Sequence, residues 1–237
     1  MAQAPNTLEG WYALHDMRAV DWAAWEDMPA AKRAGIVGAV SALLADAADA
    51  KDSGEGSSAV YAVPGHKADL MILHLRPAMD DLLRLDAALS STGFGAVTRR
   101  TFSYLSVVEL GQYTSPSTSE RPDPARQAQI ERRLKPSIPR VRYVSFYPMN
   151  KRRGEHRNWY TLDLEARRDL MHGHGAVGRA FRGQVQQMVT GSMGFDDWEW
   201  GVTLFAADPL PIKKIVQVMR YDEASAVYGE FGPFFFG

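Results

Sequence analysis

The predicted order of strands and helices occurs twice along this chain. Hydrophobic alternation and helical periodicity predict a strand–helix–strand–strand–helix–strand order that begins with a strand over residues 8–20. The same order begins again with a strand over residues 141–149, about 133 residues later. This spacing is too long for a solenoid repeat but suits two ferredoxin-like halves. We therefore predict an α+β fold with two ferredoxin-like (βαββαβ) halves, which form a dimeric α+β barrel-type subunit.

The remaining elements follow from turn signals and apolar spacing. Asp21 is predicted to cap a short helix, and Pro29 begins a long one, because a proline early in a helix removes no hydrogen bond. Helices are predicted over residues 29–50, 77–90, 127–134, 164–181 and 209–221, and further strands over residues 59–63, 70–75, 102–110, 185–190, 198–205 and 228–236. Residues 113–125 are polar and rich in proline, which is typical of a linker. The predicted domains are residues 1–112, a linker with a helix over residues 113–140, and residues 141–237.

Composition argues against several classes of protein. The chain is 46% hydrophobic and 23% charged, with a formal net charge of -1, so nothing favours binding to nucleic acid or to an anionic membrane. It has no cysteine, which excludes disulfides, thiolate nucleophiles and cysteine-bound metals. The first residues lack a basic segment followed by an apolar run, and no apolar run approaches the roughly 20 residues of a membrane-spanning helix. We expect a cytoplasmic protein without a membrane span.

The strand that opens the second half carries a phenol and an ammonium group on one face. Because alternate residues of a strand point to opposite faces, Tyr147 and Lys151 share a face, with Met149 between them. A tyrosine here is also typical of a half-buried residue at the rim of a sheet, and Lys151 with its two arginine neighbours is also typical of a solvated charge run. A basic end to this strand would nevertheless suit a ligand with several carboxylates.

The helix predicted over residues 164–181 has one histidine inside its apolar stripe. His174 lies in this stripe, whereas His172 points about 200° away, so the two cannot bind one metal ion. His174 is either a core histidine with a satisfied hydrogen bond or the single protein ligand of an iron porphyrin, which needs only one. A sheet face with the phenol and the ammonium group, covered by this helix, would form a cofactor cavity.

Residues 173–178, GHGAVG, match the dinucleotide-binding pattern G-x-G-x-x-G. That pattern requires a strand before it and a helix that begins at it, whereas the residues before Gly173 are helix formers. We interpret these glycines instead as positions where a bulky group, such as a flat ring, can approach the backbone.

Three other groups leave a functional and a structural interpretation open. Gln187 shares a predicted strand face with Val189, so its amide could point inward. Asp196, Asp197 and Glu199 could form a paired-carboxylate site for acid–base chemistry, but they fit better as turn residues and charges at a rim. The aromatic C-terminus, YGEFGPFFFG, fits a core strand or a subunit interface better than a platform for nucleic-acid bases.

Longer stretches of the second half carry a family resemblance. The chain resembles the coproheme decarboxylases of the chlorite dismutase-like superfamily in the segments FYPMNKRR, NWYTL, LMHGHGAVGR and QMVTGSMGFDDWEWGVTLFA, and from DPLPIKKIVQ to the C-terminus. The resemblance is dense over residues 141–237 and thinner over the first half. It implies a C-terminal domain that binds an iron porphyrin, an N-terminal domain without a cofactor, and usually a homopentamer.

The resemblance also implies a reaction. Hydrogen peroxide oxidises iron coproporphyrin III (coproheme), which is both substrate and redox cofactor. Two propionates lose carbon dioxide in turn and become vinyl groups, which gives haem b through a three-propionate intermediate. This is the last step of coproporphyrin-dependent haem biosynthesis, and a coproporphyrin ferrochelatase would be the donor of the substrate.

Matching motifs imply roles for single residues. His174, in LMHGHG, matches the proximal iron ligand, and Tyr147, in FYPM, matches the tyrosine that becomes a radical and attacks the propionate. Lys151 lies beside that tyrosine and is expected to manage the phenolic proton, so both are expected catalytic residues. The residues expected to bind the porphyrin are Arg133, Tyr147, Pro148, Met149, Asn150, Lys151, Gln187 and Ser225.

The distal position separates this chain from neighbouring families. Gln187, in QQMVTG, matches the distal glutamine of one branch of the decarboxylases, whereas chlorite dismutases have an arginine there, so chlorite decomposition is disfavoured. Arg133, in IERRLKPS, matches a propionate-binding arginine, and the adjacent Arg132 is its alternative. Two other functions stay open, namely a haem-binding or haem-transfer protein without catalysis and a general haem peroxidase.

Overall fold

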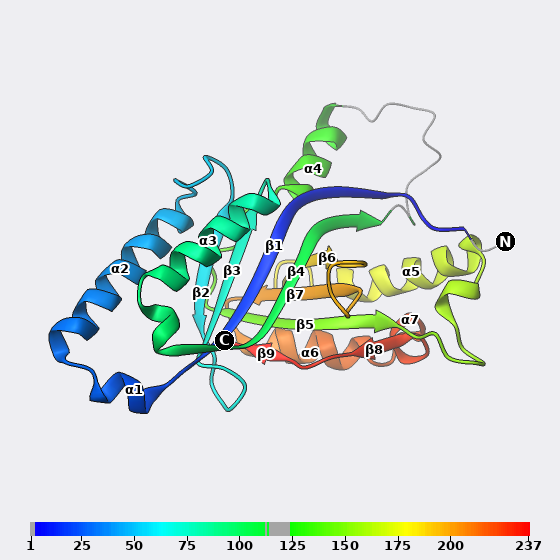
Figure 1. The fold of residues 1–237 in the computed structure, drawn as a ribbon. Coiled ribbons are helices and arrows are strands. Elements are labelled where there is room, and N and C mark those ends of the chain that lie inside the picture. The colour runs from blue at the N-terminus through cyan, green and yellow to red at the C-terminus, as the bar shows by residue number, and fades with distance from the viewer. Residues whose placement is uncertain (1–2, 112, 114–123) are drawn as a thin grey trace. The chain divides into compact units, whose positions relative to one another are not determined.

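The computed structural model describes residues 3–111, 113 and 124–237 (Figure 1). The predicted linker, residues 113–125, lies for the most part outside the described residues. Packing divides the described residues into two compact units. The C-terminal unit holds residues 3–10, 108–111, 113, 124–134 and 139–234, and the N-terminal unit holds residues 11–107, 135–138 and 235–237. Because these units group residues by packing alone, the predicted domain boundaries stay a prediction.

The first half has the predicted β-α-β-β-α-β order. Asp21 caps the short helix as predicted, because its side chain accepts a hydrogen bond from the backbone N–H of Ala24 at 3.0 Å. The elements are β1 (Thr7–Val20), α1 (Trp22–Asp27), α2 (Ala30–Ala48), β2 (Ser57–Ala62), β3 (Leu70–Arg76), α3 (Met79–Ser91), η1 (Phe94–Ala96) and β4 (Thr98–Gly111).

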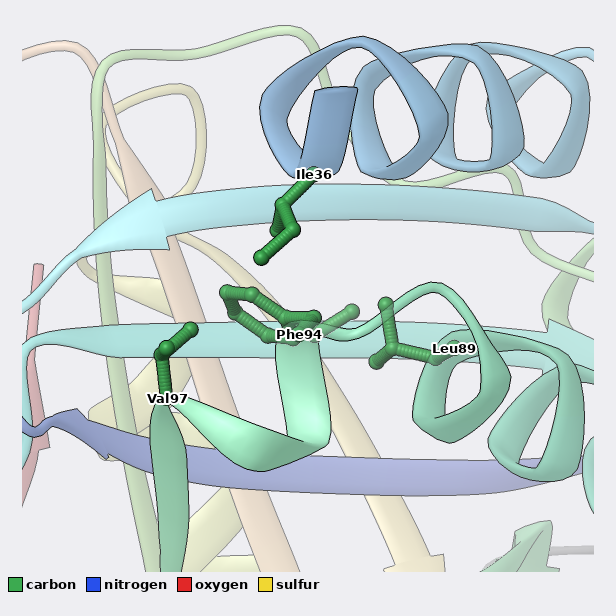
Figure 2. Close-up of a cluster of buried hydrophobic side chains, with 5 residues drawn as sticks. Ile36, Leu89, Phe94 and Val97 are labelled. Atoms are coloured by element: carbon green, nitrogen blue, oxygen red, sulfur yellow. The ribbon is translucent and has the colours of Figure 1, made fainter. Parts of the chain in front are cut away.

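The N-terminal unit buries its core between a sheet and two helices. Its strands lie in the order β2-β3-β1-β4, and β3 pairs antiparallel with both of its neighbours. Helices α2 and α3 cover one face of this sheet (Figure 1). Figure 2 shows the core cluster that they enclose, whose buried members are Ile36, Ile72, Leu89, Phe94 and Val97.

The second half repeats the order, and the predicted α+β class with two βαββαβ halves is confirmed. Its elements are α4 (Pro124–Leu134), β5 (Tyr143–Lys151), η2 (Trp159–Thr161), α5 (Leu164–Arg179), β6 (Gln186–Gly191), β7 (Trp200–Ala206), α6 (Pro209–Met219), α7 (Glu223–Ala226), β8 (Gly229–Phe231) and β9 (Phe235–Phe236). Aspartate side chains cap three of its helices: Asp163 begins α5, Asp208 begins α6 and Asp222 begins α7.

The sheet of the C-terminal unit has the strand order β6-β7-β5-β8. Its central strand β7 pairs antiparallel with β5 and β6, so that Val202 lies between Tyr147 and Val189. Helices α5 and α6 contact each other, and α6 packs on β7. The sheet therefore presents one face to a layer of helices.

The prediction of one continuous strand over residues 228–236 is wrong. It is split into β8 and β9, and a short helix, α7, precedes it. Pro233 has no backbone N–H to give to a ladder. Gly232 packs so closely that a Cβ atom would lie 2.8 Å from Cγ of Pro148 and 2.9 Å from the ring of Trp198. This Gly-Pro pair interrupts the strand.

One finding bears on membranes. Within the part of the chain that the structure describes, every helix is too short or too polar to cross a bilayer.

Candidate functional site

A cavity of about 650 Å³ lies in the C-terminal unit. Alternate residues of three paired strands form its floor, as the two-residue period of a strand requires. The register pairs Met149 with Trp200 and Gln187 with Leu204. The floor residues are Tyr147, Met149 and Lys151 from β5, Gln187 and Val189 from β6, and Trp200, Val202 and Leu204 from β7. The predicted shared face of Tyr147 and Lys151 is thus the floor of a cavity.

Helices supply the opposite wall of the cavity. Helix α5 contributes Met171, His174 and Gly175, and helix α6 contributes Ile215 and Met219. His172 is exposed and lies outside the lining, as the helical period predicts. The GHGAVG segment lies inside α5, with helix before it rather than a strand, so the context that a dinucleotide site requires is absent among these described residues.

His174 is held by the cap of α7. Its Nδ1 lies 2.8 Å from Oδ2 of Asp222 and 3.4 Å from Oγ of Ser225. The same Asp222 oxygen accepts the backbone N–H of Ser225 at 3.1 Å. A carboxylate accepts the proton of Nδ1–H, and Nε2 then keeps its lone pair for a ligand. The arrangement is typical of a histidine that is oriented to bind a metal.

Lys151 is a buried cation with its charge satisfied by two neighbours. Its side chain lies at the end of β5, where Nζ donates a hydrogen bond to the carbonyl oxygen of Ala224 (3.0 Å) and stands 4.3 Å from the centre of the Trp159 ring. Burial lowers the pKa of Lys151 to about 8, and the carboxylate of Asp222 opposes this shift. Near neutral pH this amine can both give and take a proton.

Tyr147 lies in an aromatic cluster. Its ring stacks on Phe234 at a centroid distance of 4.4 Å and is tilted against Phe231 at 5.9 Å. The guanidinium of Arg220 lies 3.8 Å from the centre of the Phe231 ring. Burial raises the pKa of the Tyr147 phenol to about 12, and Arg220 opposes this shift. The phenol therefore keeps its proton at neutral pH.

The lining of the cavity carries an excess of positive charge. Its cations are Arg133, Lys151, Arg179, Arg182 and Arg220, and Glu109 is the one carboxylic acid among the described lining residues. The floor between them is apolar at Val189, Val202 and Leu204. This combination suits a flat, apolar ligand with several carboxylates.

Two of the residues predicted to bind a ligand do not line the cavity. Pro148 and Asn150 alternate with the floor residues of β5, so their side chains leave the opposite face. Pro148 packs against Gly232, and Oδ1 of Asn150 accepts the backbone N–H of Glu199 at 2.8 Å. The other predicted residues, Arg133, Tyr147, Met149, Lys151, His174, Gln187 and Ser225, all line it.

Glu199 is buried rather than part of a charged rim. The residue is only 8% exposed. Its Oε2 accepts a hydrogen bond from the backbone N–H of Lys151 at 3.1 Å. The hydroxyl of Tyr160 donates to the same oxygen, and Arg153 lies 3.7 Å from Oε1. Glu199 thus fixes the end of β5 to the segment after it. The sequence left open a role for Glu199 in acid–base chemistry. Its hydrogen-bond and ion-pair partners come from segments distant in sequence, so local patterns could not predict them.

Comparison with known proteins places the chain in a family. The profile of the chlorite dismutase family matches residues 33–237. The chain belongs to the chlorite dismutase family. Among the described residues no group of three or more acidic, histidine or cysteine side chains could hold a metal ion, and His174 is the one histidine of the described cavity lining.

Three known proteins are similar to the chain over all or nearly all of its length. A heme-binding protein from Thermus thermophilus has a structure that matches with a TM-score of 0.92 and 46% identity, over 100% of this chain and 94% of that one. A protein from Haloquadratum walsbyi that is named for proposed heme binding is 46% identical over 240 residues. All of this chain is covered in that match, but the chain spans only 45% of the relative. A mutant chlorite dismutase from Candidatus Nitrospira defluvii shares the fold at a TM-score of 0.76 and 20% identity, over 97% of this chain and 91% of that one.

Proposed function

We propose that this protein binds iron coproporphyrin III through His174 and uses hydrogen peroxide to convert two of its propionates into vinyl groups. It is then a coproheme decarboxylase that produces haem b. The observation that carries the proposal is the placement of Tyr147 and Lys151 on the floor of a cation-lined cavity that His174 enters from a helix. Relatives that are named for heme binding support the ligand class.

The residues of the cavity fit an iron porphyrin. His174 lines the cavity, and Asp222 occupies its Nδ1, so Nε2 is the nitrogen that would bind iron. The apolar floor would contact the ring, while the five cations and Ser225 would hold its carboxylates. When bound, the iron porphyrin supplies the redox chemistry that activates peroxide. Gln187 offers an uncharged amide on the floor, which fits the glutamine branch of the decarboxylases.

The reaction defines what the protein residues must do. For each side chain, R–CH2CH2–COO⁻ + H2O2 + H⁺ gives R–CH=CH2 + CO2 + 2 H2O. The propionate loses two electrons, one proton and carbon dioxide, and peroxide takes up two electrons and two protons. The protein must therefore remove hydrogen from a saturated carbon and also deliver one net proton per turnover.

Tyr147 suits the removal of hydrogen. Its phenol is protonated at neutral pH, and burial raises its pKa further, from the ordinary 10 to about 12. Loss of one electron and one proton gives a tyrosyl radical, and the radical regains a hydrogen atom from the propionate carbon. Stacking on Phe234 holds the ring in one orientation. Tyr147 is thus the residue that we assign to the attack.

Lys151 suits the handling of charge and protons at the same edge. Four residues along a strand span about 13 Å, so Lys151 and Tyr147 would reach separate carboxylates of the ligand. Lys151 is expected to manage the phenolic proton, and over this distance it would do so through a carboxylate of the ligand or a water molecule between them. Its lowered pKa, about 8, suits proton exchange near neutral pH.

The test follows the mass of the porphyrin. Purified protein is mixed with iron coproporphyrin III, hydrogen peroxide is titrated in, and the porphyrin is analysed by mass spectrometry. We expect stepwise loss of two carboxyl groups, through a species with three propionates. Binding without a change in mass would favour a haem carrier, and oxidation of added dyes without a change in mass would favour a general peroxidase.

A matched pair of variants tests the assignment of Tyr147. Tyr147→Phe should retain porphyrin binding but lose decarboxylation, because phenylalanine keeps the ring and removes the phenol. Tyr143→Phe is the control, since Tyr143 lies on the same strand but outside the cavity lining. Unchanged decarboxylation by Tyr147→Phe would refute the role.

A further inference from the structure

Glu109 is a cavity residue to which the proposed reaction has so far assigned no role. It lies near the end of β4, is half-buried, and lines the cavity together with the floor residues of β6 and β7. The described lining holds five cations, and Glu109 is its one carboxylic acid. A carboxylate in a cavity for a ligand with several carboxylates would repel that ligand.

The fold makes a specific place for this side chain. A Cβ atom on Gly191, at the end of β6, would overlap Oε2 of Glu109, so only glycine leaves room for the carboxyl group there. Trp200, which Gly191 faces across the strand pair, also lines the cavity and lowers the pKa of Glu109. Gly191 therefore leaves the space that the carboxyl group of Glu109 occupies beside the cavity floor.

The surroundings of Glu109 raise its pKa. Burial raises its pKa above the usual value, the negative charge of Glu9 on β1 raises it further, and Trp200 opposes both. Tyr113 also lines the cavity; burial raises the pKa of its phenol, the charge of Arg167 of α5 opposes this shift, and the charge of Glu109 adds to it. The five lining cations are the remaining charged groups of the cavity.

Binding of an anionic ligand would raise the pKa of Glu109 further. Additional carboxylates beside Glu109 disfavour its charged form, so ligand binding and proton uptake are linked. The reaction in turn consumes one net proton for each propionate that is lost. A protonated carboxylic acid at the floor is a source for that proton.

We propose that Glu109 takes up a proton when the anionic porphyrin binds and delivers it to the reduction of hydrogen peroxide. The transfer leaves Glu109 as a carboxylate, and solvent reloads it before the second propionate reacts. One O–H bond of the acid breaks, and one O–H bond of water forms. This inference rests on the proposed function, because it names the proton donor of the same reaction.

The first experiment counts protons without any turnover. Metal-free coproporphyrin III is titrated into the protein by calorimetry near neutral pH, in buffers that differ in ionisation enthalpy, which gives the protons taken up on binding. We expect wild type to take up more than Glu109→Gln, by up to about one proton. Glu230→Gln is the control, since Glu230 is exposed on β8 and lies outside the lining, and it should behave as wild type.

A second variant displaces the carboxyl group without removing it. Gly191→Ala places a methyl group where Oε2 of Glu109 lies, and the flexible end of the glutamate side chain moves away. We expect this variant to show the reduced proton uptake of Glu109→Gln while its overall charge is unchanged. It also keeps the inference testable if Glu109→Gln fails to fold.

The outcomes separate this inference from the proposed function. Equal proton uptake by wild type and both variants, with normal porphyrin binding, would overturn the role of Glu109 alone. Failure of wild type to bind the porphyrin would overturn both. With iron coproporphyrin III and peroxide, Glu109→Gln should decarboxylate on the order of 100-fold more slowly, while Glu109→Asp keeps part of the rate.

Discussion

Nδ1 of His174 lies 2.8 Å from Oδ2 of Asp222, and the same carboxylate caps helix α7. The donor side of this hydrogen bond is the imidazole, so the carboxylate fixes both the tautomer and the direction of the ring. Helix α7 also provides the carbonyl of Ala224 that holds the ammonium group of Lys151. One short segment therefore orients the candidate iron ligand and the cavity lysine together.

Asp222→Asn should weaken iron-porphyrin binding without unfolding the protein. Asparagine still caps a helix, but it removes the negative charge that supports His174. We expect the affinity for iron coproporphyrin III to fall about 10- to 100-fold, with a shifted iron–histidine vibration in resonance Raman spectra. Asp208→Asn, which alters the cap of α6, is the control. An unchanged affinity and vibration would show that His174 does not depend on Asp222.

Lys151 should make the stability of the ligand-free protein depend on pH. Its pKa in the folded state is about 8, below its ordinary value of 10.5, so the unfolded chain binds more protons between these two values. The free energy of unfolding should therefore rise between pH 8 and pH 10.5, by on the order of 3 kcal/mol. Below pH 8 the unfolding free energy lacks this gain, because Lys151 is then protonated in both states.

Denaturant unfolding at a series of pH values measures this effect. Lys151→Met should lose the rise, whereas Lys214→Met, at an exposed position of α6, should keep it. A rise of equal size in Lys151→Met would assign it to another group.

The floor of the site follows from the sequence because a strand has a fixed period. Tyr147, Met149 and Lys151 alternate on β5, and all three line the cavity. Pro148 and Asn150 were assigned to the ligand because their motif is contiguous, although the same period places them on the other face. The motif identifies the segment, and the period decides which of its residues face the ligand.

The carboxylates that contact the site residues could not be predicted from local sequence patterns. Asp222 lies 48 residues from its partner His174, and Glu199 lies 48 residues from Lys151. Glu109 reaches the cavity only because the end of β4 lies beside Gly191. Periodicity within an element carries no information on which loops and strand ends meet, so these carboxylates needed the fold.

Alanine variants of Arg133 and Arg132 test which of the two arginines binds the porphyrin. Neighbouring residues of a helix point about 100° apart, and only Arg133 lines the cavity. Arg133→Ala should lower the affinity for metal-free coproporphyrin III by about tenfold, which is a modest loss because the side chain is exposed. Arg132→Ala should leave it unchanged. Fluorescence titration measures both, and equal losses would contradict the assignment of Arg133.

Phe94→Ala should destabilise the N-terminal unit. The Phe94 ring is buried in the cluster with Ile36, Leu89 and Val97, and its removal leaves a cavity that this packed core cannot fill (Figure 2). We expect a loss of about 3–5 kcal/mol in the free energy of unfolding, measured with denaturant in the absence of ligand. Val37→Ala on α2 is the control, since Val37 is 52% exposed and should change stability by less than about 0.5 kcal/mol. Similar losses in both variants would mean that the cluster does not stabilise this unit as its burial indicates.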